Sequence, residues 1–310
     1  MSKPPQKGKP TVAIIGAGRL GKALALALQS SGYAIVALVA RHRATAQKAA
    51  RLFNKASARP EALGASQLGQ LPPASLIIIS TPDDGIADTA ENLSNVWAGK
   101  TGTVVLHTSG ALSSEVLAPL KGRGFHTGSI HPLISISDPV AGAEALRGAF
   151  YCLEGTRKAE ALAKSIVRDL GGSSFSIKAE KKALYHAAAV MASPHLTALF
   201  DLALEMLASC GLNKTQAQKV FIPLLESTVN NLKVSTPQQA LTGTFARGDV
   251  ATVRRHLQAL SGKDLDEAAA VYKLLGLHSL DLAKNNKVDP KRIEEIGNLL
   301  NPPRSLRSTE

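Results

Sequence analysis

The sequence predicts a doubly wound α/β domain over residues 10–178, followed by an all-helical domain over residues 179–302. Two observations predict this organisation. Strand-like and helix-like runs alternate in the first part of the chain, which is typical of a parallel sheet with helices on both faces. From residue 180 onward only helical periodicity is found. The remaining residues, 1–9 and 303–310, are expected to be flexible tails.

Each predicted element is an apolar run bounded by turn residues. The predicted strands are 12–15, 33–40, 76–80, 103–107, 125–130, 149–154 and 174–178. The helices predicted between them are 20–29, 45–53, 85–93, 113–121 and 157–170. The helices predicted for the second domain are 182–207, 214–234, 250–261, 265–284 and 290–300. Pro194 and Pro223 lie inside two of these helices, where we expect kinks or breaks.

A glycine-rich turn follows the first predicted strand. Residues 11–21 read Thr-Val-Ala-Ile-Ile-Gly-Ala-Gly-Arg-Leu-Gly, which places GxGxxG between a strand and a helix. Gly16 permits a tight turn, Gly18 lets backbone N–H groups approach phosphates, and Gly21 lets helix and strand pack closely. The helix also directs its amides and positive dipole end at an anion. The turn, with residues Gly16, Ala17, Gly18, Arg19, Leu20 and Gly21, therefore predicts a dinucleotide site; the alternative is a turn that only packs.

The end of the second predicted strand indicates which dinucleotide is bound. NAD-binding units usually carry an acidic residue there, which accepts hydrogen bonds from the ribose 2′-hydroxyl. This chain instead has Arg41 and Arg43 and no carboxylate. Because a guanidinium group binds a 2′-phosphate and an acid would repel it, the sequence predicts NADP as the cofactor. The alternative is that the arginines are ordinary solvated charges.

Composition excludes several other classes of protein. The two cysteines, Cys152 and Cys210, are far apart and form no disulfide framework, which fits a reducing compartment. No signal-type segment follows the basic N-terminus, and the apolar runs look too short and too interrupted by glycine to span a membrane, so we expect a cytoplasmic protein.

The net charge is +12, but only 4% of residues are aromatic and no basic-aromatic stripe is present. This composition favours a small anionic ligand over nucleic acid.

Polar residues follow two of the buried strands at the edge where a cofactor and substrate would meet. Ser80, Thr81 and Pro82 end one strand and are predicted to contact the cofactor; Ser109 and Gly110 follow the next. Ser109 can contact a substrate or have a structural role. Asp83 and Asp84 are better explained as helix caps.

Histidines flank the predicted strand 125–130. His131 precedes a proline, which holds its backbone extended and suits a positioned side chain. It is a candidate catalytic or substrate-contacting residue, with a structural role as the alternative. His107, His126 and His186 could be combined with it into a metal site, but no metal-ligand spacing is found, so no metal is expected.

The first helix of the second domain carries polar residues on one side. Lys182 and His186 are spaced i, i+4, and Ser193 lies two turns further along roughly the same face. Polar groups in register on an alanine-rich helix indicate a face turned toward a cleft. The alternative for Lys182 is a surface lysine in a charged first turn.

Together these motifs resemble the β-hydroxyacid dehydrogenase superfamily, through the glycine turn, Ile-Ser-Thr-Pro at 79–82, His-Thr-Ser-Gly at 107–110 and Lys-x-x-x-His at 182–186. The segments 184–193 and 241–249, with Gly155 and His256, more closely resemble a bacterial family of Rossmann-like proteins with a helical domain of unknown function. Some of its members look like an alternative ketopantoate reductase. Two departures from that family are Pro194, where it has Asn, and Thr244, where it has Pro.

The resemblance implies an NADPH-dependent reductase of a small carboxylate-bearing 2-oxo acid, with a ketopantoate-like acid as the best candidate. It implies that Lys182, with His186 one turn later, protonates the substrate oxygen or stabilises the oxyanion. His186 and His131 are expected to be further acid/base groups or substrate contacts. Ser109, Gly110 and Ser193 would bind the substrate, in a cleft between the domains. The alternatives are an imine reductase of the pyrroline-5-carboxylate type and a non-catalytic NADP-binding protein. Apolar residues on more than one helix face over residues 182–210 predict a homodimer formed through the helical domain.

Overall fold

The computed structural model describes residues 8–53, 59–284 and 288–301. Most of the two predicted tails therefore lies outside the described residues. The chain divides into two compact units, residues 1–193 and 194–310. Each unit has its own apolar core.

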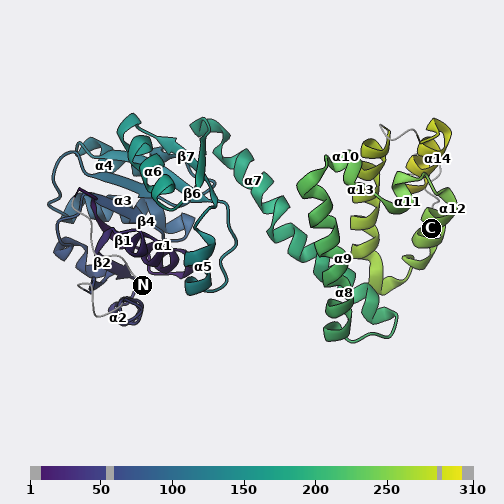
Figure 1. The fold of residues 1–310 in the computed structure, drawn as a ribbon, viewed down its shortest axis with the longest axis horizontal. Helices are drawn as coiled ribbons and strands as arrows, with labels where there is room; N and C mark the ends of the chain where they lie inside the picture. The colour runs from purple at the N-terminus through teal and green to yellow at the C-terminus, as the bar shows by residue number, and fades with distance from the viewer. Residues whose placement is uncertain (1–7, 54–58, 285–287, 302–310) are drawn as a thin grey trace. The chain divides into compact units, whose positions relative to one another are not determined.

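The first unit is built on one eight-stranded sheet with the strand order β3-β2-β1-β4-β5-β6-β7-β8 (Figure 1). Its strands are β1 (Thr11–Ile15), β2 (Ala34–Ala40), β3 (Glu61–Gly64), β4 (Leu76–Ile79), β5 (Val104–His107), β6 (His126–Pro132), β7 (Phe150–Gly155) and β8 (Ser173–Ser176). Strands β1 to β6 are parallel, and β7 is antiparallel to β6. The predicted doubly wound α/β class is confirmed, with a reversal of strand direction at β7 and an additional strand, β3, that the sequence analysis did not predict.

Two layers of helices cover the sheet, because alternate residues of its strands point to opposite faces. The helices are α1 (Arg19–Ser30), α2 (Arg43–Ala50), η1 (Ala65–Gln70), η2 (Asp83–Gly85), α3 (Ile86–Val96), η3 (Ser114–Leu117), α4 (Ala118–Gly122), α5 (Pro139–Ala145), α6 (Arg157–Asp169), η4 (Ala179–Lys181) and α7 (Lys182–Ala192). One core holds strand residues such as Ile14, Ile78 and Leu106 and includes residues of α1, α2, α5 and α6. The other holds strand residues such as Ile15 and Val105 and includes residues of α3, α4, η1 and η3.

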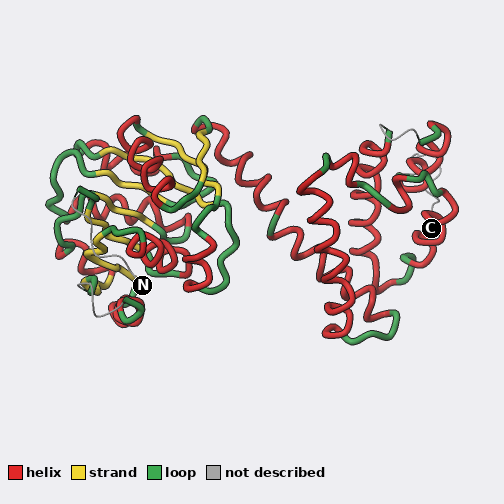
Figure 2. Tube along the Cα trace, viewed as in Figure 1, coloured by secondary structure: helices red, strands yellow, loops and turns green. Residues whose placement is uncertain are grey.

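The second unit consists of helices in its described part, and the strands drawn in yellow in Figure 2 all belong to the first unit. The helices are α8 (Pro194–Ser209), α9 (Lys214–Val234), α10 (Pro237–Ala240), α11 (Gly243–Ala246), α12 (Val250–Ala259), η5 (Lys263–Leu265), α13 (Asp266–Ala283) and α14 (Pro290–Leu300). Pro194 begins a new helix, as expected from its missing N–H group. Pro223 is instead accommodated inside α9, which is assigned as one helix.

The first compact unit extends beyond the predicted domain boundary at residue 178 and includes α7. The reason is the side chain of Lys182, the first residue of α7, which is only 1% exposed and is bonded to residues of the sheet unit. The predicted site residues Lys182 and His186 are therefore part of the same compact unit as the sheet.

One helical stretch, Ala179–Ser209, is long and apolar enough to cross a membrane by length and composition, with a mean hydropathy of 1.4 and 6% of its most apolar window buried. The expectation that every apolar run is too short does not hold for this stretch, because its many alanines are apolar and the apolar residues continue past Pro194, where α8 begins. A single helix of this kind is weak evidence for a membrane segment.

A polar cluster joins three distant segments of the first unit. The carboxylate of Asp169, at the end of α6, accepts a hydrogen bond from the Tyr33 hydroxyl at 2.8 Å and lies 2.8 Å from Nζ of Lys9. The Lys9 ammonium also donates to the carbonyl of Ser31 and lies over the Tyr33 ring. Burial raises the pKa of Asp169, but the bonds from Lys9 and Tyr33 outweigh this and hold it below its ordinary value of 3.8.

This cluster makes a prediction about stability and pH. Asp169→Asn should lower the free energy of unfolding at pH 7 by about 2 kcal/mol, since hydrogen bonds to a charged group are lost. Because the folded-state pKa is depressed, the contribution is complete above the ordinary carboxyl pKa and disappears as the pH falls through the folded-state value. Urea unfolding followed by fluorescence of Trp97, the single tryptophan, measures the effect. Glu144→Gln, on an exposed ion pair, is the matched control and should have little effect. If Asp169→Asn lowered the free energy of unfolding as much at pH 3 as at pH 7, this account would be contradicted.

Candidate functional site

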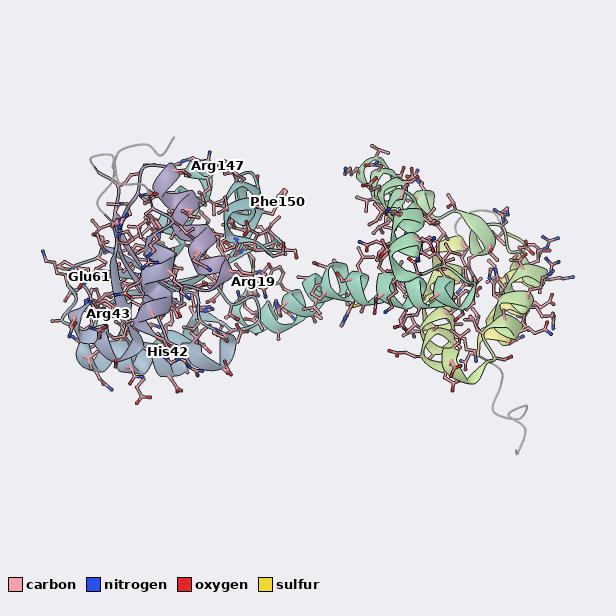
Figure 3. All side chains as sticks on the ribbon, turned by 90° about the horizontal axis from the view of Figure 1, so that it is seen from below. Arg19, His42, Arg43, Glu61, Arg147 and Phe150 are labelled. Atoms are coloured by element: carbon pink, nitrogen blue, oxygen red, sulfur yellow. The ribbon has the colours of Figure 1, made fainter. Side chains whose placement is uncertain are left out.

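A cavity of about 690 Å³ lies at the carboxyl ends of β1, β2 and β4. Seven of the predicted cofactor-binding residues line it: Gly16, Ala17, Gly18, Arg41, Ser80, Thr81 and Pro82. The other four, Arg19, Leu20, Gly21 and Arg43, are described residues that lie outside its lining; Arg19 and Arg43 are labelled in Figure 3. Asp84 and Asp88 also line the cavity, from η2 and α3.

The glycine turn has the backbone geometry that the sequence motif requires. Gly16 has a φ of +107°, and a Cβ there would collide with the backbone of Ser80. A Cβ at Gly21 would collide with the Gly16 carbonyl oxygen, so helix α1 packs directly on the turn. Gly18 is the N-cap of α1 and has open space around it. The first amides of α1, which lack intrahelical partners, are thereby left accessible to an anion.

The two arginines after β2 differ in their surroundings. Arg41 lines the cavity, whereas Nε of Arg43 donates a hydrogen bond of 3.3 Å to the carbonyl of Ala62 in β3. Figure 3 labels Arg43 and His42 at the start of α2, together with Glu61 of β3. Arg41 is therefore the better placed of the two to hold a phosphate in the cavity.

The wall of the cavity at the end of β4 holds an unpaired hydroxyl. Thr81 Oγ1 is buried and has no hydrogen-bond partner among the described residues. Beside it, Ser80 Oγ accepts a hydrogen bond of 3.4 Å from the Thr108 hydroxyl, which follows β5. The cavity is thus connected through Thr108 to the turn that carries Ser109 and Gly110. A cofactor hydroxyl or amide would satisfy the Thr81 hydroxyl, so the residues present fit a bound dinucleotide.

A row of polar side chains crosses three neighbouring strands next to the cavity. His107 of β5 pairs with Ser129 of β6, and Ser129 pairs with Glu154 of β7. Paired residues share a face of the sheet, so these three side chains lie side by side. All three are at most 7% exposed. Two residues along β6, His131 pairs with Cys152 and continues this polar surface on the same face.

Lys182 is the charged group buried against this surface. Its Nζ donates hydrogen bonds to the carbonyl of Ser109 at 3.0 Å and to the hydroxyl of Ser129 at 3.1 Å. Burial lowers the pKa of Lys182, and the nearby acidic groups of Cys152 and Glu154 only partly oppose this. The alternative of a solvated surface lysine is therefore excluded by the structure. Its catalytic role stays a prediction.

The turn after β5 is held by bonds on both sides. The backbone N–H of Ser109 donates to Nδ1 of His107 at 3.2 Å, and Nε2 of His107 lies 3.2 Å from the Ser113 carbonyl. A nitrogen that accepts and another that faces a carbonyl require the proton on Nε2. Burial, followed by the charge of Lys182, lowers the pKa of His107 to about 4, so this ring is neutral. His107 thus fixes the backbone carbonyl that holds Lys182.

The Ser109 hydroxyl is already engaged in three hydrogen bonds. It donates to the carboxylate of Asp83 at 2.7 Å and accepts from the amides of Ala111 and Leu112 at 3.1 and 3.0 Å. Asp83, which the sequence favoured as a helix cap, instead anchors this turn; the cap position is Pro82. The predicted substrate contact of Ser109 would require its hydroxyl to exchange one of these bonds.

Glu154 secures the segment that follows the turn. Its two carboxylate oxygens accept hydrogen bonds of 2.6 Å from the amide and the hydroxyl of Ser114. The carboxylate is therefore occupied by the start of η3 and makes no ion pair with Lys182 at salt-bridge distance in the described part of the chain. Ser129 and Glu154 were missed by sequence reasoning, although both are polar residues within otherwise apolar strands.

Two histidines and a tyrosine surround Gly110. The hydroxyl of Tyr185 lies 2.7 Å from Nδ1 of His131, and the His131 and His186 rings are 5.6 Å apart, edge to face. A Cβ at Gly110 would lie 2.9 Å from Nε2 of His131 and collide with the His186 ring. The structure thus brings His131, His186 and Gly110 together as predicted neighbours, with Tyr185 as an addition. Ser193 lies further along, exposed at the end of α7.

No group of three or more His, Cys, Asp or Glu side chains is arranged to hold a metal ion in the part of the chain that the structure describes.

Comparisons with known proteins place the fold in a class. A Rossmann-like domain family matches residues 2–132, and a domain of unknown function, DUF2520, matches residues 149–279. No curated protein sequence matches the chain. Residues 2–132 are thus similar to a Rossmann-like domain, and residues 149–279 are similar to a domain without an assigned activity.

Solved structures resemble almost the whole chain. Protein TM1727 from Thermotoga maritima is 23% identical with a TM-score of 0.69, and the alignment covers 89% of this chain and 100% of that one. BF3122 from Bacteroides fragilis, named as a candidate NADP oxidoreductase, is 23% identical with a TM-score of 0.70, covering 88% and 98%. A reductive aminase from Aspergillus terreus, solved with NADPH and ethyl levulinate, is 14% identical with a TM-score of 0.55, covering 94% and 92%. Because these sequence identities are only 14–23%, the likeness to the solved structures shows a shared fold and does not by itself show a shared activity.

Proposed function

We propose that this protein is an NADPH-dependent oxidoreductase that reduces a small carboxylate-bearing 2-oxo acid, with a ketopantoate-like acid as the first substrate to test. The observation that carries the proposal is the connection between the nucleotide cavity and a buried lysine. Ser80, in the cavity wall, is bonded to Thr108, and the next residue, Ser109, holds the ammonium of Lys182. A hydride donor and a proton donor are needed next to each other in a carbonyl reduction.

Bound NADPH would supply the hydride, and the chain's own groups would bind it. The amides at the start of α1 and the glycine turn suit the pyrophosphate, and the guanidinium of Arg41 suits the 2′-phosphate. Ser80, Thr81 and Pro82 form the wall nearest the Lys182 cluster and suit the ribose on the nicotinamide side. The unpaired hydroxyl of Thr81 supports this arrangement.

Lys182 is the proposed proton donor. Its ammonium is removed from water and held by two neutral oxygens, so the loss of a proton is easier than from a solvated lysine. As the carbonyl oxygen gains negative charge, the ammonium stabilises it and then protonates it. His186, one helical turn away, and His131 lie around Gly110 and provide further contacts to the substrate oxygen or carboxylate. Gly110, Ser109 and Ser193 remain the proposed carboxylate-binding residues.

The first alternative is an imine reductase, which would need the same hydride and a proton delivered to nitrogen. The likeness to a reductive aminase supports it at the level of the fold. The second alternative is a protein that binds NADP without turnover.

The absorbance of NADPH, followed with the purified full chain against a panel of 2-oxo acids and cyclic imines, separates these functions. We expect oxidation with a 2-oxo acid. Turnover with cyclic imines alone would replace the proposal by the imine reductase. Tight NADPH binding without any turnover would support the non-catalytic alternative.

The role of Lys182 makes the next prediction. Lys182→Ala should reduce turnover by about 10²–10⁴-fold, the usual effect of losing a positioned proton donor. NADPH affinity should change little, because Lys182 does not line the nucleotide cavity. Lys181→Ala removes the neighbouring exposed lysine and is the matched control. Near-normal turnover in Lys182→Ala, with Trp97 fluorescence showing a folded protein, would refute the assignment.

The positions of the two arginines predict unequal effects on cofactor choice. Arg41→Ala should weaken NADPH binding by about 1–3 kcal/mol and leave NADH binding almost unchanged, since the bonds lost are those to the 2′-phosphate. Arg43→Ala should have a smaller effect, because its Nε is bonded to Ala62. Isothermal titration of both cofactors measures this. Equal binding of NADPH and NADH by the unaltered protein would sink the NADP assignment.

We also propose that the protein is a cytoplasmic homodimer. The second unit exposes large apolar side chains on its helices, among them Leu224 at 62%, Leu232 at 49% and Leu274 at 70% exposure. A second copy of the chain would cover these side chains, and they are more numerous than isolated surface residues require. The same explanation, without a bilayer, extends to the apolar stretch Ala179–Ser209. The thiols of Cys152 and Cys210 are both free, which fits a reducing compartment.

Light scattering at micromolar concentration should give twice the mass of one chain. Leu224→Glu combined with Leu274→Glu should shift the mass toward that of one chain, because charge would be buried at the interface. A single-chain mass for the unaltered protein would contradict the dimer.

A further inference from the structure

His131 and Tyr185 form a hydrogen-bonded pair whose direction decides what His131 can do. The Tyr185 hydroxyl lies 2.7 Å from Nδ1 of His131, a short contact between partly buried groups. Burial raises the pKa of Tyr185 above its usual range, so the phenol keeps its proton. The bond can then run from the phenol to an unprotonated Nδ1, or from a protonated Nδ1 to the phenol oxygen.

The surroundings of Tyr185 favour the first direction. The phenol also bonds to the thiol of Cys152, the residue that pairs with His131 across β6 and β7. Burial raises the pKa of the Cys152 thiol, so it keeps its proton and can donate it toward the phenol oxygen. An imidazole nitrogen is a much better acceptor for the phenol proton than a thiol sulfur. The phenol therefore donates its proton to Nδ1 of His131, and the sulfur of Cys152 is the weaker competitor for that proton.

The other ring nitrogen of His131 lies against Gly110. A Cβ on Gly110 would lie 2.9 Å from both Nε2 and Cε1 of His131 and would collide with the His186 ring. The two imidazoles can approach this turn only because residue 110 has no side chain. Gly110 follows Ser109, whose carbonyl holds Lys182, so Nε2 and the lysine ammonium converge on one turn.

His131 carries a single proton under ordinary conditions. Burial, and then the charges of Lys182 and His186, lower its pKa to about 4. The groups that face the ring are Tyr185, His186 and Lys182 from α7, Cys152 from β7 and His107 from β5. None of these contacts offers a carboxylate that would stabilise an imidazolium. With Nδ1 accepting from Tyr185, the one proton is on Nε2.

We infer that Tyr185 is a positioning residue that holds His131 as a neutral imidazole with its proton on Nε2, directed at the substrate oxygen beside Gly110. This inference rests on the proposed reductase function and refines it. His131 then stabilises the forming alkoxide by donating a hydrogen bond, and it gives up no proton. The proton comes from Lys182, whose N–H bond breaks as the O–H bond of the product forms.

Nitrogen-15 NMR of the histidine rings in the full chain, without cofactor or substrate, tests the tautomer directly. We expect Nδ1 of His131 to have the shift of an unprotonated nitrogen and Nε2 that of a protonated one, with the signals assigned from a His131→Gln variant. Tyr185→Phe should convert this into a mixture of tautomers. A protonated Nδ1 in the unaltered protein, or an unchanged tautomer in a folded Tyr185→Phe variant, would overturn the inference.

The second unit offers a matched control. There the Tyr272 hydroxyl lies 2.8 Å from Nδ1 of His256, a similar pair outside the proposed site. Tyr272→Phe should leave the His131 signals and turnover unchanged. The control tests whether loss of any histidine-tyrosine pair disturbs the protein in general.

Turnover measurements distinguish a Tyr185 that positions the His131 ring from a Tyr185 that only packs against it. Tyr185→Phe should lower kcat about tenfold, an effect of the size of one hydrogen bond. His131→Gln keeps an N–H donor near the Nε2 position and should retain more activity than His131→Ala. In the His131→Gln background, Tyr185→Phe should have no further effect on kcat, because no tautomer remains to be set; a second tenfold loss would overturn the inference. If no substrate is ever turned over, the proposed function fails while the NMR result still decides the tautomer.

Discussion

The burial of one ammonium group against a sheet underlies the arrangement of the whole candidate site. Lys182 is 1% exposed, and its Nζ is bonded to the carbonyl of Ser109 and the hydroxyl of Ser129. A buried charge held by neutral oxygens is costly, since such bonds replace hydration only in part. This arrangement explains why so many nearby groups are polar and fixed. His107 and Asp83 hold the turn of Ser109, and Glu154 holds the next segment through Ser114.

The neutral state of His107 and His131 follows from their burial and, second, from the same charge. His107 and His131 have pKa values lowered to about 4, by burial first and by the Lys182 charge second. The cluster therefore combines one cationic donor, Lys182, with the neutral imidazoles of His107 and His131. These rings can accept or donate hydrogen bonds without adding a second positive charge. Such a division of roles suits a reaction in which an oxygen must be stabilised and protonated in one place. The hydrogen bond between Ser80 and Thr108 connects this cluster to the cavity at the ends of β1, β2 and β4.

Much of the fold could be predicted from the sequence because its signals are local. The glycine turn stands between a strand and a helix in the sequence, and its backbone geometry at Gly16 follows from the motif. The strand β3 was missed because Glu61–Gly64 is four residues long and only partly apolar. The boundary between the compact units also differs from that predicted, since helical periodicity begins at residue 180 while the Lys182 side chain packs into the sheet unit.

The cluster around Lys182 was predictable only in part, because one of its signals is spacing within a single helix and others are not visible in the sequence. Lys182 and His186 share a helix face by their i, i+4 spacing, and this could be inferred. Ser129, Glu154 and Tyr185 join the site through strand register and long-range contacts, which a single sequence does not specify. Two polar residues in buried strands, Ser129 and Glu154, were a usable but overlooked sign of a polar surface. Arg41 and Arg43 looked equivalent, and only the hydrogen bond of Arg43 to Ala62 distinguishes them.

The central claim is that burial makes Lys182 a readily deprotonated donor. The most direct measurement is an NMR titration of the lysine side chains of the full chain with ¹³C and ¹⁵N labels, in which Lys182 is assigned from a Lys182→Arg variant and the exposed Lys181 serves as internal reference. The account predicts that Lys182 titrates below Lys181 and below the ordinary lysine pKa of 10.5. A Lys182 titration that coincides with that of Lys181 would contradict it.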